Sequence, residues 1–408
     1  MNKLLFIFLF LILIPLTNAL QNASVCGTLS TAGEYYIMNQ SLNTTTTCFT
    51  ISANNIILDG NGFNISGDSG SGDYGVLVLA VTNATIKNMN ISTFDGGVTV
   101  STGGNHLIEN NSFYSNLDSI IFNTAGTNRA VNNSIFNSSG NGIKFQASSS
   151  NTVEGGVIDE SKQDAILFST GASDNNNITN VIITNTNSSH YDLKWDTANI
   201  DNTWLIDMPQ ILNYTFTGIG GTLGIKNSNY GSIRFLSKVN GTGTNLTDTV
   251  KITNNSMFVN STLYLLFNRS SEINIYNNPF ALSKILRDDI ECPATICANL
   301  TSLNSTTVVF NITHWTTYSL GEEIIEVISP PSSSGGANYP TSYEENTSVS
   351  LISNVTNEEI KKIKQQEMNL FLLAIASFII IGFTTMMIIL AMLTTHKKTQ
   401  KSATVGVF

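Results

Sequence analysis

The stretch NHLIENNSF (residues 105–113) repeats the pattern of NATIKNMNI (83–91). Each has a starting residue, an apolar residue at the third position after it, a special residue at the fifth, and another apolar residue at the eighth. The pattern recurs along the chain with successive starts separated by 28, 22, 23, 22, 25 and 22 residues, at Asn55, Asn83, Asn105, Asn128, Ser150, Asn175 and Thr197. A repeat of this length is typical of stacked coils.

A second set of apolar segments precedes these matches in phase: GVLV (75–78), GVTV (97–100), SIIF (119–122), GIKF (142–145), AILF (165–168) and DLKW (192–195). Each repeat therefore holds three short strands. The fifth-position residue is always Gly or Asn, and both enter the left-handed backbone region at low cost. Neither a helical spacing nor the frequent turns of a hairpin meander fits. The sequence predicts an all-β fold, a right-handed parallel β-helix.

Coils of such a solenoid stack about 4.8 Å apart, so equivalent residues lie above one another. The fifth-position asparagines are expected to form an internal ladder of amide hydrogen bonds: Asn88, Asn110, Asn133, Asn180 and Asn202. Asn110 also begins an N-x-S triplet, and a place inside the ladder would keep it unglycosylated. Residues 26–50 are expected to close the N-terminal end as a terminal coil.

The four cysteines form two close pairs, Cys26 with Cys48 and Cys292 with Cys297. On an exported chain we expect two disulfides, and local pairing is the simplest of the three possible connectivities. A cysteine-based metal site would need further ligands nearby, whereas the histidines are scattered. We expect no metal and no other cofactor.

The two ends of the chain predict export and membrane attachment. Residues 1–19 have the cation, the apolar run and the small residues of a secretory signal peptide. Residues 369–393 form a transmembrane helix long enough to cross the ~30 Å hydrocarbon core of a bilayer. Basic residues follow, which places the tail 394–408 in the cytoplasm. We expect a single-pass protein of the cell membrane with an extracellular ectodomain.

The repeat is lost after residue 210, which divides the ectodomain. Residues 20–210 are assigned to the β-helix, and the β-rich segments of 211–322 to a β-sandwich-like domain. Residues 323–356 include SPPSSSGGANYP and are interpreted as a flexible stalk. A capping box at Thr356 predicts a juxtamembrane helix over 357–368, whose pattern also permits a homo-oligomer.

Charged residues make up only 12% of the chain, and the formal net charge is −10. No basic patch is present, so nucleic acid is not an expected partner. The expected partners are the membrane and either surface glycans or neighbouring surface proteins. On an exported chain, N-x-S/T triplets are candidate glycosylation sites. They include Asn22, Asn64, Asn137, Asn187, Asn240 and Asn311.

The candidates for catalysis are weak. Hydrolysis of a glycoside needs two carboxyl groups about 5–9.5 Å apart, one of them protonated. Asp118, Asn141 and Asp164 occupy one predicted row, in which the two aspartates would be about 10 Å apart. The simpler interpretation is that Asp and Asn begin turns. A lyase would need a basic residue beside an acidic Ca²⁺ cluster, and no such cluster faces Arg129.

The stretch CFTISANNIILDGNGFNISG (48–67), with the N-x-x-I-x-N motifs after it, resembles right-handed β-helix proteins of the pectin-lyase-like superfamily, in particular archaeal cell-surface members. It is also similar to the β-helix of the periplasmic copper-binding maturation proteins of nitrous oxide reductase, without paired copper ligands. CPATIC (292–297) with FNITHWTTYSLGE (310–322) looks like the closing β-module of archaeal surface proteins, and we expect its Trp and Tyr in the core.

The resemblance implies a fold, not a reaction. The favoured function is a membrane-anchored, glycosylated cell-surface protein whose non-catalytic rod serves carbohydrate binding, adhesion or surface-layer-type interactions. The alternative is a tethered polysaccharide hydrolase or lyase.

Overall fold

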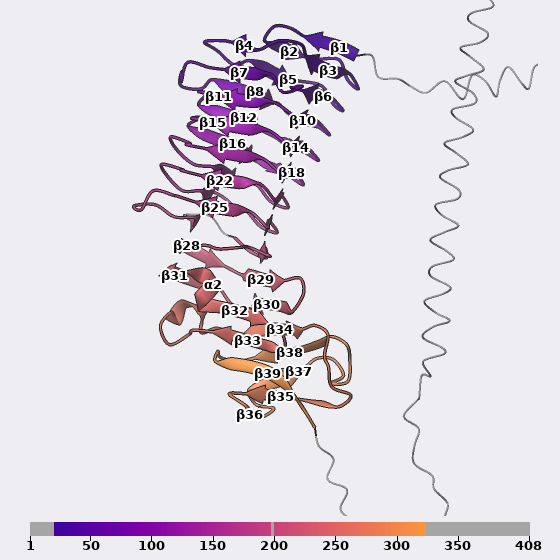
Figure 1. Cartoon of the computed structure of the whole chain (residues 1–408), viewed down its shortest axis with the longest axis vertical. Coiled ribbons are helices and arrows are strands. Elements are labelled where there is room, and N and C mark those ends of the chain that lie inside the picture. The colour runs from indigo at the N-terminus through magenta and orange to yellow at the C-terminus, as the bar shows by residue number, and fades with distance from the viewer. Residues whose placement is uncertain (1–19, 197–199, 324–408) are drawn as a thin grey trace, which may run out of the picture. The chain divides into compact units, whose positions relative to one another are not determined.

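The computed structural model describes residues 20–196 and 200–323. Figure 1 shows short strands winding through successive coils, followed by antiparallel strands. Several predicted segments lie outside the described residues. They are the signal peptide, the stalk beyond Glu323, the juxtamembrane helix, the transmembrane helix and the cytoplasmic tail. Within those residues, no helix is long and apolar enough to cross a membrane.

The largest sheet, sheet A, contains one strand from every coil and continues beyond the last coil. Its strands in spatial order are β1 (Leu20–Ala23), β3 (Tyr35–Met38), β6 (Ile57–Asp59), β10 (Thr85–Lys87), β14 (Leu107–Glu109), β18 (Arg129–Val131), β21 (Thr152–Glu154), β24 (Asn177–Thr179), β27 (Thr203–Ile206), β29 (Leu223–Asn227), β30 (Gly231–Phe235), β34 (Ser271–Ile275), β38 (Val308–Ile312) and β37 (Cys297–Asn299).

The other two faces of each coil belong to sheets B and C. Sheet B contains β2 (Gly27–Leu29), β5 (Phe49–Ile51), β8 (Tyr74–Val78), β12 (Gly96–Val100), β16 (Asp118–Asn123), β20 (Ile143–Gln146), β23 (Ile166–Ser169), β26 (Leu193–Trp195), β28 (Asn213–Gly221) and β31 (Val239–Thr244). Sheet C contains β4 (Leu42–Asn43), β7 (Asn64–Ser66), β11 (Asn90–Ser92), β15 (Ser112–Tyr114), β19 (Ser134–Phe136), β22 (Val157–Asp159) and β25 (Ile182–Thr184). A short three-stranded sheet at one corner comprises β9 (Val81–Thr82), β13 (Gly103–Gly104) and β17 (Ala125–Gly126).

Left-handed residues make the corners of each coil. The first corner comes at the start of each repeat, at Asn55, Asn83, Asn105, Thr127, Ser150, Asn175 and Asn202, with φ between 54° and 62°. The next comes before sheet C, at Asn88, Asn110, Asn132, Gly155 and Asn180, with φ between 51° and 64°. The predicted mechanism of bending is therefore confirmed, although its positions need correction at three coils.

The first two corrections are one-residue shifts of the corner. In the first coil, Asn61 and Gly62 have positive φ instead of Gly60. In the fourth coil, the corner is at Asn132 instead of Asn133, so Ala130 and Ile135 point inward instead of Val131 and Phe136. Both errors arise because neighbouring Asn and Gly residues can adopt the left-handed conformation equally well.

In the last repeat, Asn202 lies at the first corner, because Leu205 pairs with Ile178 in sheet A. The spacing from Asn175 to Asn202 is 27 residues, which is longer than the 22 to 25 residues between successive corners from Asn83 to Asn175. Because of these additional residues, the predicted match that starts at Thr197 assigned Asn202 to the corner before sheet C, whereas Asn202 lies at the corner before sheet A.

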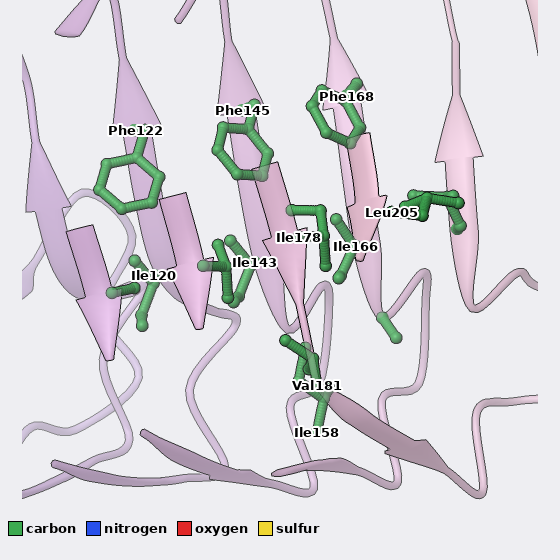
Figure 2. Close-up of a cluster of buried hydrophobic side chains, with 14 of the residues drawn as sticks. Ile120, Phe122, Ile143, Phe145, Ile158, Ile166, Phe168, Ile178, Val181 and Leu205 are labelled. Atoms are coloured by element: carbon green, nitrogen blue, oxygen red, sulfur yellow. The ribbon is translucent and has the colours of Figure 1, made fainter. Parts of the chain in front are cut away.

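The core is a set of columns in which equivalent inward side chains stack between coils. Figure 2 shows the isoleucine column of Ile120, Ile143 and Ile166 beside the phenylalanine column of Phe122, Phe145 and Phe168. The ring centroids of Phe145 lie 5.4 Å from those of Phe122 and 4.5 Å from those of Phe168. Burial of these apolar side chains between successive coils stabilises the stack.

The aromatic column continues beyond the parallel coils. Trp195 packs on Phe168, with centroids 6.5 Å apart, and on Phe216, with centroids 4.3 Å apart. Phe216 in turn contacts Phe267, which contacts Phe235. The core therefore runs without interruption from the parallel coils into the antiparallel strands that follow them.

The predicted end of the β-helix at residue 210 falls too early. β28 and β29 still pair in parallel with β26 and β27, respectively. The direction changes where β29 meets β30 in sheet A and where β28 meets β31 in sheet B. The remaining elements are α2 (Leu246–Thr249), the 3₁₀ helix η1 (Leu265–Phe267) and a five-stranded antiparallel sheet of β32 (Val250–Thr253), β33 (Ser256–Val259), β39 (Thr317–Glu322), β35 (Ser283–Arg287) and β36 (Ile290–Glu291). The described part of 211–322 belongs to the same compact unit as the coils. Trp315 and Tyr318 are buried in it, as predicted.

Candidate functional site

The row of Asp118, Asn141 and Asp164 exists and is buried, with exposed fractions of 6%, 3% and 2%. The backbone N–H and the Nδ2 of Asn141 donate to Asp118 Oδ1 over 2.9 and 2.8 Å. The backbone N–H of Asp164 donates to Asn141 Oδ1 over 3.2 Å. The three side chains thus join adjacent coils where the strands of sheet B begin.

Both carboxylates of this row also have cationic partners on the outer face of sheet B. Lys144 Nζ lies 3.0 Å from Asp118 Oδ2, and Lys194 Nζ lies 3.4 Å from Asp164 Oδ2. Asp164 Oδ1 accepts from the backbone N–H of Tyr191 and lies 3.6 Å from His190 Nδ1. A catalytic pair needs a carboxyl group that keeps its proton and is open to substrate. Asp118 and Asp164 are buried and ion-paired, so they are not open to substrate, and this geometry favours a structural role.

Asp95 and Arg129, which also lie in the coils, have partners of their own. Asp95 accepts from the backbone N–H of Gly72 over 2.9 Å. Arg129 lies on sheet A and forms an exposed ion pair with Glu154 over 2.9 Å. Among residues 20–196 and 200–323, no group of three His, Cys, Asp or Glu side chains could hold a metal ion.

The internal asparagine ladders lie one residue after the corners, and this corrects the predicted column. Asn128 donates from its backbone N–H and Nδ2 to Asn151 Oδ1 over 3.0 and 2.9 Å. Asn151 donates in the same way to Asn176 Oδ1. A second ladder joins Asn111 to Asn133. In each case an inward amide oxygen accepts from a backbone N–H in the preceding coil, which satisfies a buried donor.

Only Asn133 of the five predicted members belongs to such a ladder. Asn88, Asn110 and Asn180 are exposed at the corners themselves, and Asn202 Oδ1 accepts from Arg234. The physical reason is that a left-handed residue turns the chain while its own side chain points outward. The prediction that Asn110 escapes glycosylation therefore loses its basis.

His106 replaces asparagine at the N-terminal end of the longer ladder. Its ring Nδ1 accepts from the backbone N–H of Ala84 over 3.0 Å, and the backbone N–H of His106 donates to Asn128 Oδ1. The side chain is 1% exposed. Burial lowers the pKa of His106 from 6.5 to about 4, and the Val81 carbonyl offsets only part of this effect. The neutral ring thus acts as a hydrogen-bond acceptor within the core.

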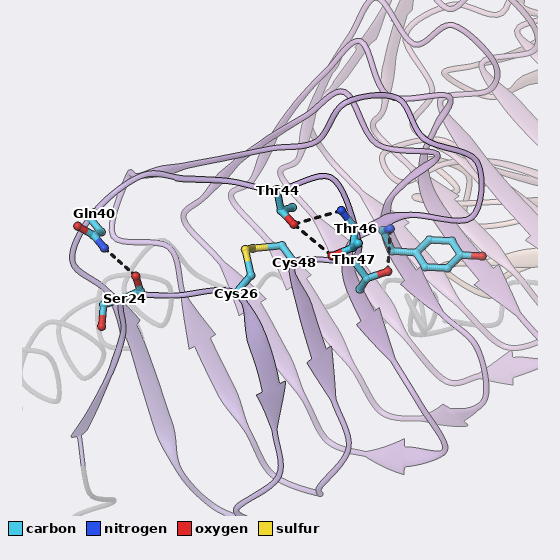
Figure 3. The surroundings of a disulfide bond; sticks show 8 residues. Ser24, Cys26, Gln40, Thr44, Thr46, Thr47 and Cys48 are labelled. Atoms are coloured by element: carbon cyan, nitrogen blue, oxygen red, sulfur yellow. Dashed lines mark hydrogen bonds between the residues drawn. A yellow bond between two sulfur atoms is a disulfide. The ribbon is translucent and has the colours of Figure 1, made fainter.

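Both predicted disulfides are present. Cys26 and Cys48 precede neighbouring strands of sheet B, and their Cα atoms are 4.5 Å apart (Figure 3). This bond joins the terminal coil that precedes the first repeat to the coil of the first repeat, as expected. Cys292 and Cys297 close a short loop in the antiparallel part.

The named glycosylation candidates lie at accessible positions, with one exception. Asn22, Asn64, Asn137, Asn187 and Asn240 are exposed. Asn311 is only partly exposed on β38, and its Oδ1 is buried. The use of these sites stays a prediction.

Two outward aromatic groups were missed from the sequence. On sheet C, the rings of Tyr114 and Phe136 stack with centroids 5.3 Å apart and planes inclined by 16°. Tyr114 is 44% exposed, and amide side chains such as Asn90 lie on the same sheet face. The sequence could have indicated this pair. Tyr114 and Phe136 each directly follow an inward residue of their strand, and the next residue along a strand points outward.

The second group is Trp204 on the outer face of sheet A. Its indole lies over Gly224 of the next coil, where a Cβ atom would come within 2.3 Å of the ring. The absence of a side chain at Gly224 allows the indole to pack close to the sheet. Thr179 and Lys226 lie on the flanking strands.

The family model described as "Right handed beta helix region" matches residues 38–205. The chain contains a right-handed β-helix. This fold is typical of carbohydrate-binding and carbohydrate-active proteins, and it does not specify a reaction. No curated protein sequence matches the chain.

Two solved structures share similarity with the chain. The hyperthermoactive exopolygalacturonase from Thermotoga maritima has a TM-score of 0.35 and 12% identity, over 52% of this chain and 56% of that one. The tailspike protein of Acinetobacter baumannii phage AM24 has a TM-score of 0.29 and 10% identity, over 74% of this chain and 73% of that one. The chain therefore covers little more than half of the exopolygalacturonase.

Proposed function

We propose that the chain is a membrane-anchored, glycosylated cell-surface protein whose β-helix binds carbohydrate without cleaving it. The observation that carries the binding role is the stacked pair of Tyr114 and Phe136 on the outer face of sheet C. Aromatic rings provide an apolar surface against which the C–H groups of a sugar can pack, while neighbouring amide and hydroxyl groups supply hydrogen bonds.

The polar neighbours of the pair are suitably placed. Asn90 Nδ2 donates to Asn64 Oδ1 over 2.8 Å on the coils before Tyr114, so these amides have a fixed orientation. Asp159 pairs with Phe136 in the sheet register on the next coil. The pair is thus bordered along the sheet by hydrogen-bonding groups on both sides, as expected for a site that recognises hydroxyl groups.

The non-catalytic part of the proposal is supported by the state of the two carboxylates. Asp118 and Asp164 are buried and paired with Lys144 and Lys194. Neither is placed to donate a proton to a glycosidic oxygen. The proposed membrane attachment and extracellular location are supported by the apolar runs at 1–19 and 369–393.

The test of binding uses residues 20–323, which lie in one compact unit with a continuous core. A glycan array should retain the fragment, and calorimetry with the retained glycan should show a roughly tenfold loss of affinity on Tyr114→Ala. Phe136→Ala should act in the same way. Ile182→Ala is the matched control, because Ile182 is an exposed outward residue of the same sheet. Unchanged binding by both aromatic variants would refute the proposed site.

The enzymatic alternative has a separate outcome. Release of reducing or unsaturated ends from a polysaccharide panel, abolished by Asp164→Asn, would show that the protein is a hydrolase or lyase. Membrane attachment is tested on the full chain, which should stay in the membrane fraction after alkaline carbonate extraction and start at Leu20 by N-terminal sequencing.

A further inference from the structure

A pocket of about 230 Å³ opens where the regular coils end. It is lined by residues of β27, the connection after it, β29, α2 and β32. Sheet C has its last strand at β25, and the chain runs from β27 to β28 without another strand in that sheet. The third side of the last coil is therefore covered by α2 and β32 instead of a strand, and the cover leaves a hollow.

The walls of this pocket are aliphatic. Leu205, Ile211, Leu246 and Val250 belong to the core and also line the pocket. Among the described residues that line the pocket there is no aromatic ring, which distinguishes this site from the ring pair on sheet C. A pocket with aliphatic walls and no ring fits an alkyl chain better than a sugar, because it offers burial of methylene groups and few hydrogen bonds.

The rim of the pocket is polar. Its described charged residues are two lysines, Lys226 and Lys251, and one aspartate, Asp207. Lys226 has no acidic partner within ion-pair distance among the residues that the structure describes. The ammonium group of Lys251 lies 3.8 Å from Asp248, and its side chain is half exposed, so this pair is weak. Asp207 is the one acidic residue among the described lining residues, and its Oδ1 accepts from the backbone N–H of Ser228.

We propose that this pocket binds a small aliphatic carboxylate. The alkyl chain would lie on the wall formed by Leu205, Ile211 and Leu246, and the carboxylate would pair with Lys226 at the rim. The pocket and the ring pair share no residue, so the site does not depend on the proposed carbohydrate binding.

Photolabelling of the full-length chain tests the proposal. The probe is octanoic acid that carries a diazirine near its methyl end, and the comparison probe is its primary amide. Mass spectrometry should place the label within residues 205–211 and 246–253. The acid should label at roughly tenfold lower concentration than the amide, as expected for a gained ion pair that is partly solvated. Shortening the acid by two methylenes should weaken labelling about fifteenfold.

Two variants separate the role of charge from that of the cavity. Lys226→Met should reduce labelling by the acid to the level of the amide, whereas Lys284→Met, on β35 outside the pocket, should change nothing. Thr247→Trp, at an exposed rim position, should block both probes without disturbing the core. Circular dichroism confirms that each variant is folded. Equal labelling by acid and amide, an acid preference that survives Lys226→Met, or labels outside the pocket would each overturn the proposal.

Discussion

His106 makes the stability of the β-helix depend on pH in a defined window. In the unfolded chain its imidazole has a pKa near 6.5, whereas burial in the ladder lowers the pKa to about 4. Between these values the unfolded state binds a proton that the folded state does not. The contribution of His106 to the free energy of unfolding is therefore almost fully present above pH 7, and it decreases as the pH falls towards 4. From pH 7 to pH 4.5, the linkage relation gives a loss of about 2.4 kcal/mol from this residue.

His106→Asn isolates that contribution. An asparagine at this position can place its Oδ1 where Nδ1 accepts from Ala84, and it does not titrate. Urea unfolding of the 20–323 fragment, followed by circular dichroism, measures the free energy of unfolding at both pH values. The variant should lose about 2.4 kcal/mol less than the parent on acidification.

The comparison cancels the contributions of all carboxylates, because both proteins contain them. His314→Asn is the matched control, since His314 is not buried, and it should respond to acid as the parent does. An equal loss of stability in the parent and in His106→Asn would show that His106 is not held neutral in the core.

Three further outcomes follow from the structure. Removing the Cys26–Cys48 disulfide by double substitution with serine should lower the free energy of unfolding by roughly 3 kcal/mol, as expected for a loop of 22 residues, and unchanged urea midpoints would contradict this. Phe145→Ala should cost about 3–5 kcal/mol because its ring is fully buried between two others, whereas Tyr114→Ala should cost less than about 1 kcal/mol in the same assay. Asp164→Ala should lower the free energy of unfolding by about 3 kcal/mol, because it leaves Lys194 without its partner. The double variant Asp164→Ala/Lys194→Met should recover part of that loss. A double variant as unstable as the single one would show that the ion pair is unimportant.

The repeat of apolar residues was sufficient to predict the fold, because a parallel coil places equivalent residues in one column. The strands at Leu58, Ile86, Ile108, Val153 and Ile178 pair as the spacing predicts. The phase failed where two candidate corner residues are adjacent, as at Asn132 and Asn133. Composition cannot resolve such a choice, since both residues tolerate positive φ and only packing decides which one turns inward.

The site was harder to predict than the fold. The row of Asp118 and Asp164 followed from the register, but its pairing with Lys144 and Lys194 depends on outward positions that the template did not include. The Tyr114 and Phe136 pair depends on the same outward positions. The pocket beneath β27 depends on α2 and β32, which lie beyond the repeat. A repeat pattern describes what the coils have in common, whereas these features arise from where single coils differ.

The constant register of the coils has a consequence for length. Sheets A, B and C all advance by 22 residues between the coil of Thr85 and the coil of Leu107. A duplication of residues 105–126 would therefore insert one whole coil with every column in place, and it would lengthen the stack by about 4.8 Å. The protein can thus be extended or shortened by whole coils, and because Tyr114 lies within residues 105–126, this duplication would add a second copy of its ring to the stack on sheet C.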